Sequence, residues 1–172
     1  MTEAAALARL AAARASLDAL DAPDAPGRLT VVARGYATLD LDEAQTNATR
    51  SITHHEVRSA ADDTLLGARC RIVVTVDGPW IVLLEPSTEG RLAASLARHG
   101  PGPVVEYLAP AAPGEEAVAA AARARIPLSP PAGGPLGKER LVLGNPAWGP
   151  HLILLDEPPA GAPGPPPATI EW

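Results

Sequence analysis

A phrase that occurs twice constrains this chain most. Residues 79–86 read PWIVLLEP, and residues 150–158 read PHLILLDEP. Each copy follows a Leu-Gly step and an aliphatic run, at 66–76 and at 136–144. A period of about 70 residues predicts two copies of one supersecondary unit, neither of which can bury its sheet face alone. The repeat therefore predicts two paired modules that form a cup, with any ligand site inside it.

The composition limits the class of protein. Of the 172 residues, 47% are hydrophobic and 20% are charged, which is typical of a globular domain with a sizeable core. The net charge of −6 argues against a nucleic-acid partner. No apolar run reaches the ~18 residues of a bilayer span, and the N-terminus lacks a signal-peptide pattern. We therefore expect a cytoplasmic protein without a membrane partner, with the single cysteine, Cys70, as a small core residue.

Periodicity and turn residues predict the order of elements. An Ala-rich amphipathic helix is expected over 2–20. The first module then has a strand at 29–39, a helix at 40–52 and strands at 53–59, 66–76 and 79–86. After a helix at 87–100, the second module has a strand at 103–110, a helix at 113–125, an extended piece at 126–131 and strands at 137–144 and 150–158.

This order predicts an α+β fold in which two βαβββ modules form an eight-stranded, incompletely closed barrel. The chain then divides into an N-terminal helix and linker at 1–27, a two-module domain at 28–157 and a Pro/Gly-rich tail at 158–172. The modules themselves span 28–86 and 103–157.

Three stretches of the sequence resemble the vicinal oxygen chelate superfamily, which includes glyoxalases, bleomycin-resistance proteins and extradiol dioxygenases. GYATLDLDEA at 35–44 resembles its first strand-to-helix junction, and NPAWGPHLILLDE at 145–157 resembles its last strand. VLLEPSTEGRLAASLARHGPG at 82–102 is similar to the middle of methylmalonyl-CoA epimerase. The resemblance covers roughly residues 28–157 and implies the same cup.

The resemblance also implies where a metal would bind. Enzymes of the superfamily usually hold a divalent ion with His, Glu or Gln side chains on the first, fourth, fifth and eighth strands. The matching positions here are Ala33, Val82, Val105 and Leu154, or Ile153 if the internal repeat sets the register. None of these side chains has a donor atom. We therefore expect no metal and no cofactor at this site.

Strand alternation from these positions predicts the lining of the cup. The expected substrate contacts are Ala33, Trp80, Val82, Val105, Glu139, Leu154 and Asp156. The candidate catalytic groups are Tyr107 and His55 as acid or base, and Arg69 and Arg71 as stabilisers of an oxyanion. Such a pocket, apolar with a few polar groups, suits a small organic ligand.

Alternatives remain open for most of these polar residues. Arg69 and Arg71 could instead pair with carboxylates across an exposed strand, and Tyr107 could be a core residue. On the strand at 53–59, the inward set could be His54, Glu56 and Arg58 rather than the set with His55. By the repeat, His151 occupies the Trp80 position and could face the cup.

Three functions are compatible with the sequence. The first is a metal-independent isomerase, cyclase or lyase of bacterial specialised metabolism, which holds a small substrate in the apolar cup. The second is a binding protein without catalysis, like the antibiotic-sequestering relatives. The third is an interaction module that docks through the helix at 2–20 or the tail. A homodimer is a further possibility in each case.

Overall fold

A computed structural model of the chain describes residues 2–17, 29–52, 55–76, 78–111 and 114–162. The elements of the N-terminal half are α1 (Glu3–Ala15), β1 (Leu29–Ala37), α2 (Leu41–Ser51), β2 (His55–Ser59), β3 (Ala68–Thr75) and β4 (Trp80–Pro86). The remaining elements are α3 (Arg91–His99), β5 (Gly102–Pro110), α4 (Gly114–Arg123), β6 (Ala132–Gly134), β7 (Gly137–Leu141) and β8 (His151–Leu155).

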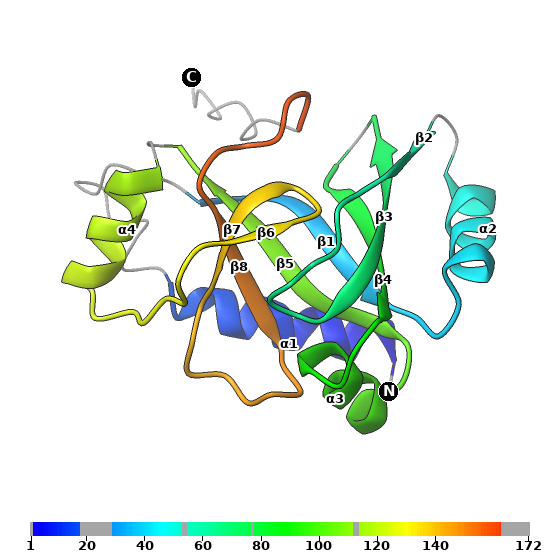
Figure 1. The fold of residues 1–172 in the computed structure, drawn as a ribbon, viewed down its shortest axis with the longest axis horizontal. Coiled ribbons are helices and arrows are strands. Elements are labelled where there is room, and N and C mark those ends of the chain that lie inside the picture. Colours follow the sequence, from blue (N-terminus) through cyan, green and yellow to red (C-terminus); the bar gives the residue numbers. More distant parts are fainter. Residues whose placement is uncertain (1, 18–28, 53–54, 77, 112–113, 163–172) are drawn as a thin grey trace, which may run out of the picture.

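All eight strands form one mixed sheet in the order β2-β3-β4-β1-β5-β8-β7-β6 (Figure 1). The two central strands, β1 and β5, pair in antiparallel fashion, and each pairs in parallel with the last strand of its own module. The halves are thus two copies of one βαβββ unit. The predicted α+β class and the eight-stranded open half-barrel are confirmed.

The strand pairing shows which residues of the two modules are equivalent. Ala33 pairs with Trp80 in the first module, and Val105 pairs with His151 in the second. Trp80 and His151 occupy the same place in the doubled phrase, so the repeat identified in the sequence is also the repeat of the fold.

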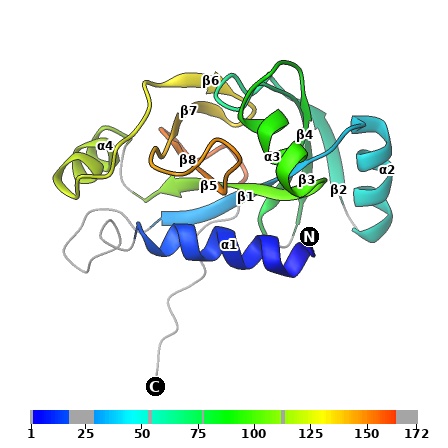
Figure 2. The same cartoon turned by 90° about the horizontal axis from the view of Figure 1, so that it is seen from below.

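The two faces of the sheet differ in what covers them (Figure 2). The inner face packs against Leu66, Leu92 and Leu136 from the loops and α3. The outer face carries α1 and α4, and α4 buries Ala117 and Ala121 there. The cup thus opens away from α1, and its inner face positions the residues of the predicted site.

A buried carboxylate fastens α1 to the outer face. Glu106 of β5 is 2% exposed and accepts hydrogen bonds from Arg14 at 2.9 Å and from Arg34 at 3.2 Å. Because Glu106 is an outward residue of a central strand, this pairing connects the N-terminal helix to the middle of the sheet.

Three element boundaries differ from the prediction. The first helix ends at Ala15, and residues 16 and 17 form a turn. Residues 18–20, which the prediction also placed in the helix, lie outside the described part of the chain. The α3 helix begins only at Arg91, after Gly90. The piece at 126–131 makes one isolated bridge, and the second strand of the second module is β6 instead. Pro127, Pro130 and Pro131 lack the N–H group that a sheet ladder needs.

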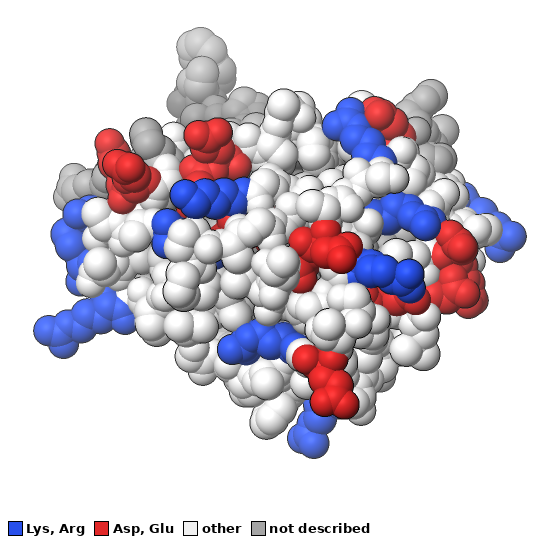
Figure 3. Space-filling view, viewed as in Figure 1, with Lys and Arg blue, Asp and Glu red and all other residues white. Residues whose placement is uncertain are grey.

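Charged side chains of both signs lie next to one another on the face shown in Figure 3. Ion pairs of the described residues include Arg58 with Glu56 at 2.7 Å and Lys138 with Asp156 at 3.4 Å. Among the described residues, no helix is both long and apolar enough to cross a membrane.

Candidate functional site

Four apolar residues occupy the positions at which the resemblance predicts the ligands of a metal. Ala33, Val82, Val105 and Ile153 are fully buried in the cluster that covers the inner face. They come from β1, β4, β5 and β8.

The prediction of Leu154 as an inward residue is wrong. Leu154 packs on the outer face with Leu108 and Ala121. Along β8, the inward residues are His151, Ile153 and Leu155, because successive side chains alternate between the faces. The register set by the internal repeat is therefore the one that the fold adopts.

These positions do not fit a divalent metal. None of the four side chains carries an oxygen, nitrogen or sulfur atom that could act as a ligand. Within the described ranges, no group of three or more His, Cys, Asp or Glu residues could hold an ion.

The polar centre of the inner face is a pair of buried carboxylates beside a buried tyrosine. Tyr107 is fully buried and donates its hydroxyl hydrogen bond to Asp63 Oδ2 at 3.0 Å. Asp63 Oδ1 accepts the amide of Leu66 at 2.9 Å, and Glu139 Oε1 accepts the amide of Leu136 at 3.1 Å. Each carboxylate therefore holds one of the two Leu-Gly turns that cover the inner face.

Burial sets the protonation of these groups. It raises the pKa of Glu139 to about 8, and the nearby charge of Asp63 adds to the rise. Burial also raises the pKa of Asp63, but hydrogen bonds from Leu66 and Tyr107 oppose it. The pKa of the Tyr107 hydroxyl is raised well above its ordinary value, mainly by burial. At neutral pH, burial thus favours a protonated Glu139.

Three side chains of the inner face bury a polar atom that has no hydrogen-bond partner in the described structure. The atoms are Glu139 Oε2, Trp80 Nε1 and His151 Nδ1. The other nitrogen of His151 lies 3.2 Å from Ser95 Oγ, and burial lowers the pKa of His151 to about 4. Because buried polar groups normally have partners, these atoms mark where the cup could accept a polar ligand or water.

The prediction that Arg69 and Arg71 line the cup is wrong. The inward residues of β3 are Cys70 and Ile72, which belong to the inner cluster. Arg69 bonds to Glu85 at 2.7 Å, opposite it on β4, and Arg71 bonds to Asp42 of α2 at 2.8 Å. The outer surface supplies these counter-charges at low desolvation cost, whereas two guanidinium groups inside the cup would lose their hydration. The alternative reading, pairing across the strand, is the one observed for Arg69.

Asp156 is also placed differently from the prediction. It follows the inward Leu155, so its side chain lies on the outer side, where Arg140 bonds to it at 3.2 Å. His55 is the first residue of β2, and its side chain lies outside the described part of the structure. Its proposed acid–base role stays a prediction.

The remaining expected contacts face the cup. Trp80, Tyr107 and Glu139 are all buried in its interior, at 3%, 0% and 0% exposure, and Cys70 is a buried free thiol. His151 also faces inward, as the repeat allowed. Sequence reasoning missed Asp63 and Ser95. The sequence around Asp63 is compatible with a turn in which this carboxylate accepts a backbone amide of its own loop. Nothing in the neighbouring sequence, however, indicates its hydrogen bond to Tyr107.

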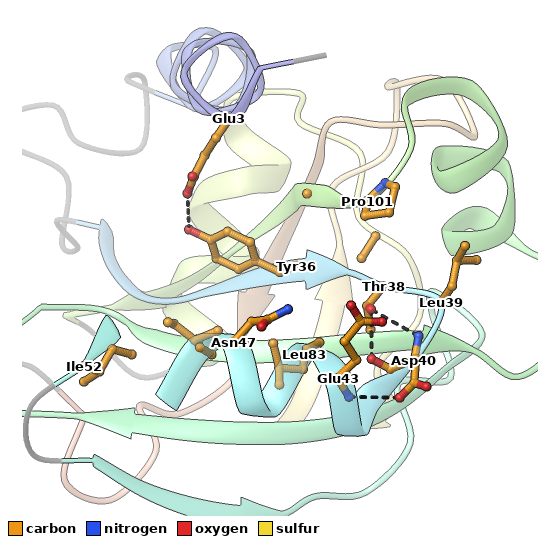
Figure 4. A pocket seen from close by; sticks show the side chains of 15 residues that line it. Glu3, Tyr36, Thr38, Leu39, Asp40, Glu43, Asn47, Ile52, Leu83 and Pro101 are labelled. Atoms are coloured by element: carbon orange, nitrogen blue, oxygen red, sulfur yellow. Dashed lines mark hydrogen bonds between the residues drawn. The ribbon is translucent and has the colours of Figure 1, made fainter. Parts of the chain in front are cut away.

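The outer surface of the described residues has several hollows, including one beside α2 and one beside α4. The first, of about 610 Å³, lies between α2 and the outer side of β1 and β4 (Figure 4). The second, of about 880 Å³, lies beside the start of α4 and is lined by Lys138, Arg140 and Asp156.

Comparison with known proteins identifies the fold. The methylmalonyl-CoA epimerase of Mycobacterium tuberculosis is 18% identical, with a TM-score of 0.63 over 73% of this chain and 86% of that one. A variant of the Streptomyces coelicolor methylmalonyl-CoA epimerase, in complex with 2-nitronate-propionyl-CoA, is 23% identical, with a TM-score of 0.57 over 74% and 96%. The chain has the vicinal oxygen chelate fold.

A hypothetical protein from Bacillus halodurans shares this fold at 15% identity, with a TM-score of 0.57 over 73% of this chain and 92% of that chain. No family model matches the sequence, and no curated protein matches it either. The fold is therefore fixed by three-dimensional similarity, and the chemistry has to be argued from the side chains.

Proposed function

We propose that this chain is a metal-independent enzyme that acts on a small organic molecule by acid–base chemistry, of the isomerase, cyclase or lyase type. The observation that carries the proposal is the convergence of Asp63, Tyr107 and Glu139 on the inner face, with Glu139 Oε2 lacking a partner. Pairs of titratable groups whose surroundings separate their pKa values are the usual basis of acid–base catalysis.

Each member of the cluster has a distinct role in this proposal. Asp63 is the base, because Tyr107 and the Leu66 amide donate hydrogen bonds that stabilise its charge. Glu139 is the acid, because burial keeps it protonated at neutral pH. Tyr107 positions Asp63 through its hydroxyl. Trp80, Val82 and Val105 supply the apolar contacts to the substrate.

Metal independence is supported by the inner face itself. A vicinal oxygen chelate enzyme that binds a divalent ion needs donor atoms on the four strands discussed above, and this chain has Ala, Val, Val and Ile there. Charge that develops on the substrate would instead meet the proton of Glu139.

Access to the cluster depends on the two Leu-Gly turns. Leu66 and Leu136 cover the inner face, and each turn is held by the carboxylate that would meet the substrate. Contact between the substrate and Asp63 or Glu139 would compete with these hydrogen bonds. Substrate entry and opening of the turns are therefore coupled in this proposal.

The test is exchange of carbon-bound protons with solvent. The purified chain, treated with EDTA, is incubated in D₂O with methylmalonyl-CoA, pyruvate and phenylpyruvate, and deuterium incorporation is followed by NMR. We expect exchange above background with at least one compound, and a loss of at least 100-fold in Asp63→Asn. Tyr107→Phe removes the hydroxyl that positions Asp63 and should slow the exchange. Its matched control is Tyr36→Phe, which removes a hydroxyl on the outer face and should leave the exchange unchanged.

Activity that EDTA abolishes would refute metal independence. Full activity in both Asp63→Asn and Glu139→Gln, with the folded state verified by circular dichroism, would refute the assignment of base and acid.

A second candidate is a binding protein without catalysis. The observation that favours it is that the inner face is filled by the chain's own side chains, with Ala33, Tyr107 and Ile153 fully buried. No exchange with any of the three compounds would favour this function over the enzyme.

A further inference from the structure

The α2 helix stands on the outer face of the sheet without burying any of its residues from 41 to 50. Its counterpart in the second module, α4, buries Ala117 and Ala121 against the sheet. In the first module, Ala44 and Ala48 face the sheet at the same four-residue spacing, but they line a hollow of about 610 Å³. Of these two equivalent helices, α4 packs directly on the sheet, whereas α2 is separated from it by the hollow.

The hollow has an apolar floor. Ile81 and Leu83 project into it from β4, and Ala37 borders it at the end of β1. Leu83 is 3% exposed and Ala37 is 2% exposed, whereas Ile81 is half-buried, so part of this floor is screened from bulk water. A volume of this size matches the concave sites that hold small organic molecules, which are mostly apolar with a few polar groups.

The polar groups of the hollow share one sign of charge. Its carboxylates come from Glu3, Asp40 and Glu43, and none of the described residues that line it is Lys, Arg or His. Asp40 uses Oδ1 to accept the amides of Asp42 and Glu43, at 2.8 Å and 3.0 Å, as the cap of α2. Glu3 accepts the Tyr36 hydroxyl at 3.2 Å.

Glu43 and Asn47 project from consecutive turns of α2 toward β1 (Figure 4). In the part of the chain that the structure describes, neither side chain has a hydrogen-bond partner. The carboxylate of Glu43 therefore faces the hollow without a counter-charge, and the Tyr36 ring lies on the opposite wall, where an aromatic face attracts a cation.

We propose that this hollow, the α2 site, binds a small organic cation: a protonated amine attached to an apolar body. The apolar body would rest on Ile81 and Leu83, and the ammonium group would lie beside the carboxylate of Glu43. An anionic ligand is disfavoured, because it would meet three carboxylates and no cation. The site lies on the opposite side of the sheet from the cup, so it does not depend on the function proposed for the cup.

The test is an NMR titration of the ¹⁵N-labelled full chain at low ionic strength. The probes are 2-phenylethylammonium and 3-phenylpropionate, which have similar apolar bodies and opposite charges. We expect the cation to shift the amides of residues 36–48 and 81–83 in a saturable manner, with at least 10-fold weaker binding of the anion. Raising the salt concentration should weaken the binding of the cation.

Two variants with matched controls locate the site. Glu43→Gln removes the unpaired carboxylate, and Ala48→Phe fills the hollow; we expect each to weaken binding of the cation at least fivefold. The controls are Glu116→Gln and Ala119→Phe, which make the same changes at exposed positions of α4 and should leave binding unchanged. Tyr107→Phe, in the cup, should also leave binding of the cation unchanged.

The proposal is overturned if the two probes bind equally, if the shifted amides lie outside the α2 site, or if no saturation occurs up to the solubility of the cation. It is also overturned if Ala48→Phe binds the cation as well as the unmodified chain. Absence of proton exchange at the cup would not change any of these outcomes. Failure of the function proposed for the cup can therefore be distinguished from failure of the α2 site.

Discussion

The buried carboxyl group of Glu139 predicts an unusual dependence of stability on pH. In the folded chain, burial and the charge of Asp63 raise its pKa from 4.5 to about 8. Between these two values, the folded state keeps a proton that the unfolded state has lost. The free energy of unfolding therefore falls as the pH rises through this window, by about 1.4 kcal/mol per pH unit and by about 5 kcal/mol in all.

Glu139→Gln should remove this dependence. The amide oxygen can still accept the Leu136 amide, and the side chain has nearly the same volume but no titrating group. At pH 5, where Glu139 is protonated in the folded chain, the two proteins should differ by less than about 1 kcal/mol. At pH 9 the Gln variant should be the more stable, by several kcal/mol.

The measurement is urea unfolding, followed by far-UV circular dichroism from pH 5 to pH 9. Glu116→Gln, the same change on the exposed side of α4, is the control and should run parallel to the unmodified chain. Parallel curves for Glu139→Gln and the unmodified chain would refute the reasoning. They would mean that the interior lets Glu139 ionise freely, and Glu139 could then not serve as the acid proposed for the cup.

Urea unfolding also tests three further changes. Glu106→Gln should cost about 2 kcal/mol, because a carboxylate that is 2% exposed loses its charge between two guanidinium groups. Gly35→Ala should cost about 3 kcal/mol, because the new methyl group would overlap Val105 and lie 2.7 Å from Leu84. The control is Gly133→Ala, whose methyl group meets no atom within 4 Å and which should cost about 1 kcal/mol or less. Arg71→Ala should cost at most about 1 kcal/mol, because its ion pair lies at the surface.

The fold could be predicted because the sequence pattern of one module occurs twice in the chain. The doubled phrase marks the last strand of each module, and alternation along these strands correctly separates inner from outer residues once the register is known. The repeat also chose correctly between Ile153 and Leu154. The repeated phrase and the alternation of residues are enough to predict the architecture, because the strands have the same order within each module.

The face of β3 could not be predicted from the same repeat. Aligning the two Leu-Gly steps makes Arg69 the counterpart of Glu139. In the sheet, however, Cys70 pairs with Leu84 and Glu139 pairs with Leu155, so Cys70 is the true counterpart. The turn before β3 has one residue more than the turn before β7, and a shift of one residue moves every side chain of a strand to the other face.

The hydrogen-bond partner of Tyr107, Asp63, could not be predicted for a different reason. Asp63 lies 44 residues earlier in the chain, in a turn whose sequence explains only the bond to the Leu66 amide. Whether a loop folds over the inner face or away from it depends on packing between modules. Neither the spacing of residues nor the composition of the loop predicts that packing.

The equivalence of the two modules shows how the polar groups are distributed in the cup. Pairing places Tyr107 opposite Ile153 and Gly35 opposite Val82, so Tyr107 and Gly35 are counterparts. By the same pairing, His151 corresponds to Trp80.

At all three polar inner positions of the second module, Tyr107, Glu139 and His151, the first module has Gly35, Cys70 and Trp80 instead. A methyl group at Gly35 would overlap Val105, lie 2.7 Å from Leu84 and lie 3.3 Å from the Tyr107 ring, so the glycine makes room for these three inner side chains. At these three strand positions, the second module thus supplies the polar side chains, and the first has smaller or apolar ones. The remaining carboxylate of the cluster, Asp63, comes from a turn of the first module. A symmetric cup would place two such clusters face to face, and the buried charges would repel each other.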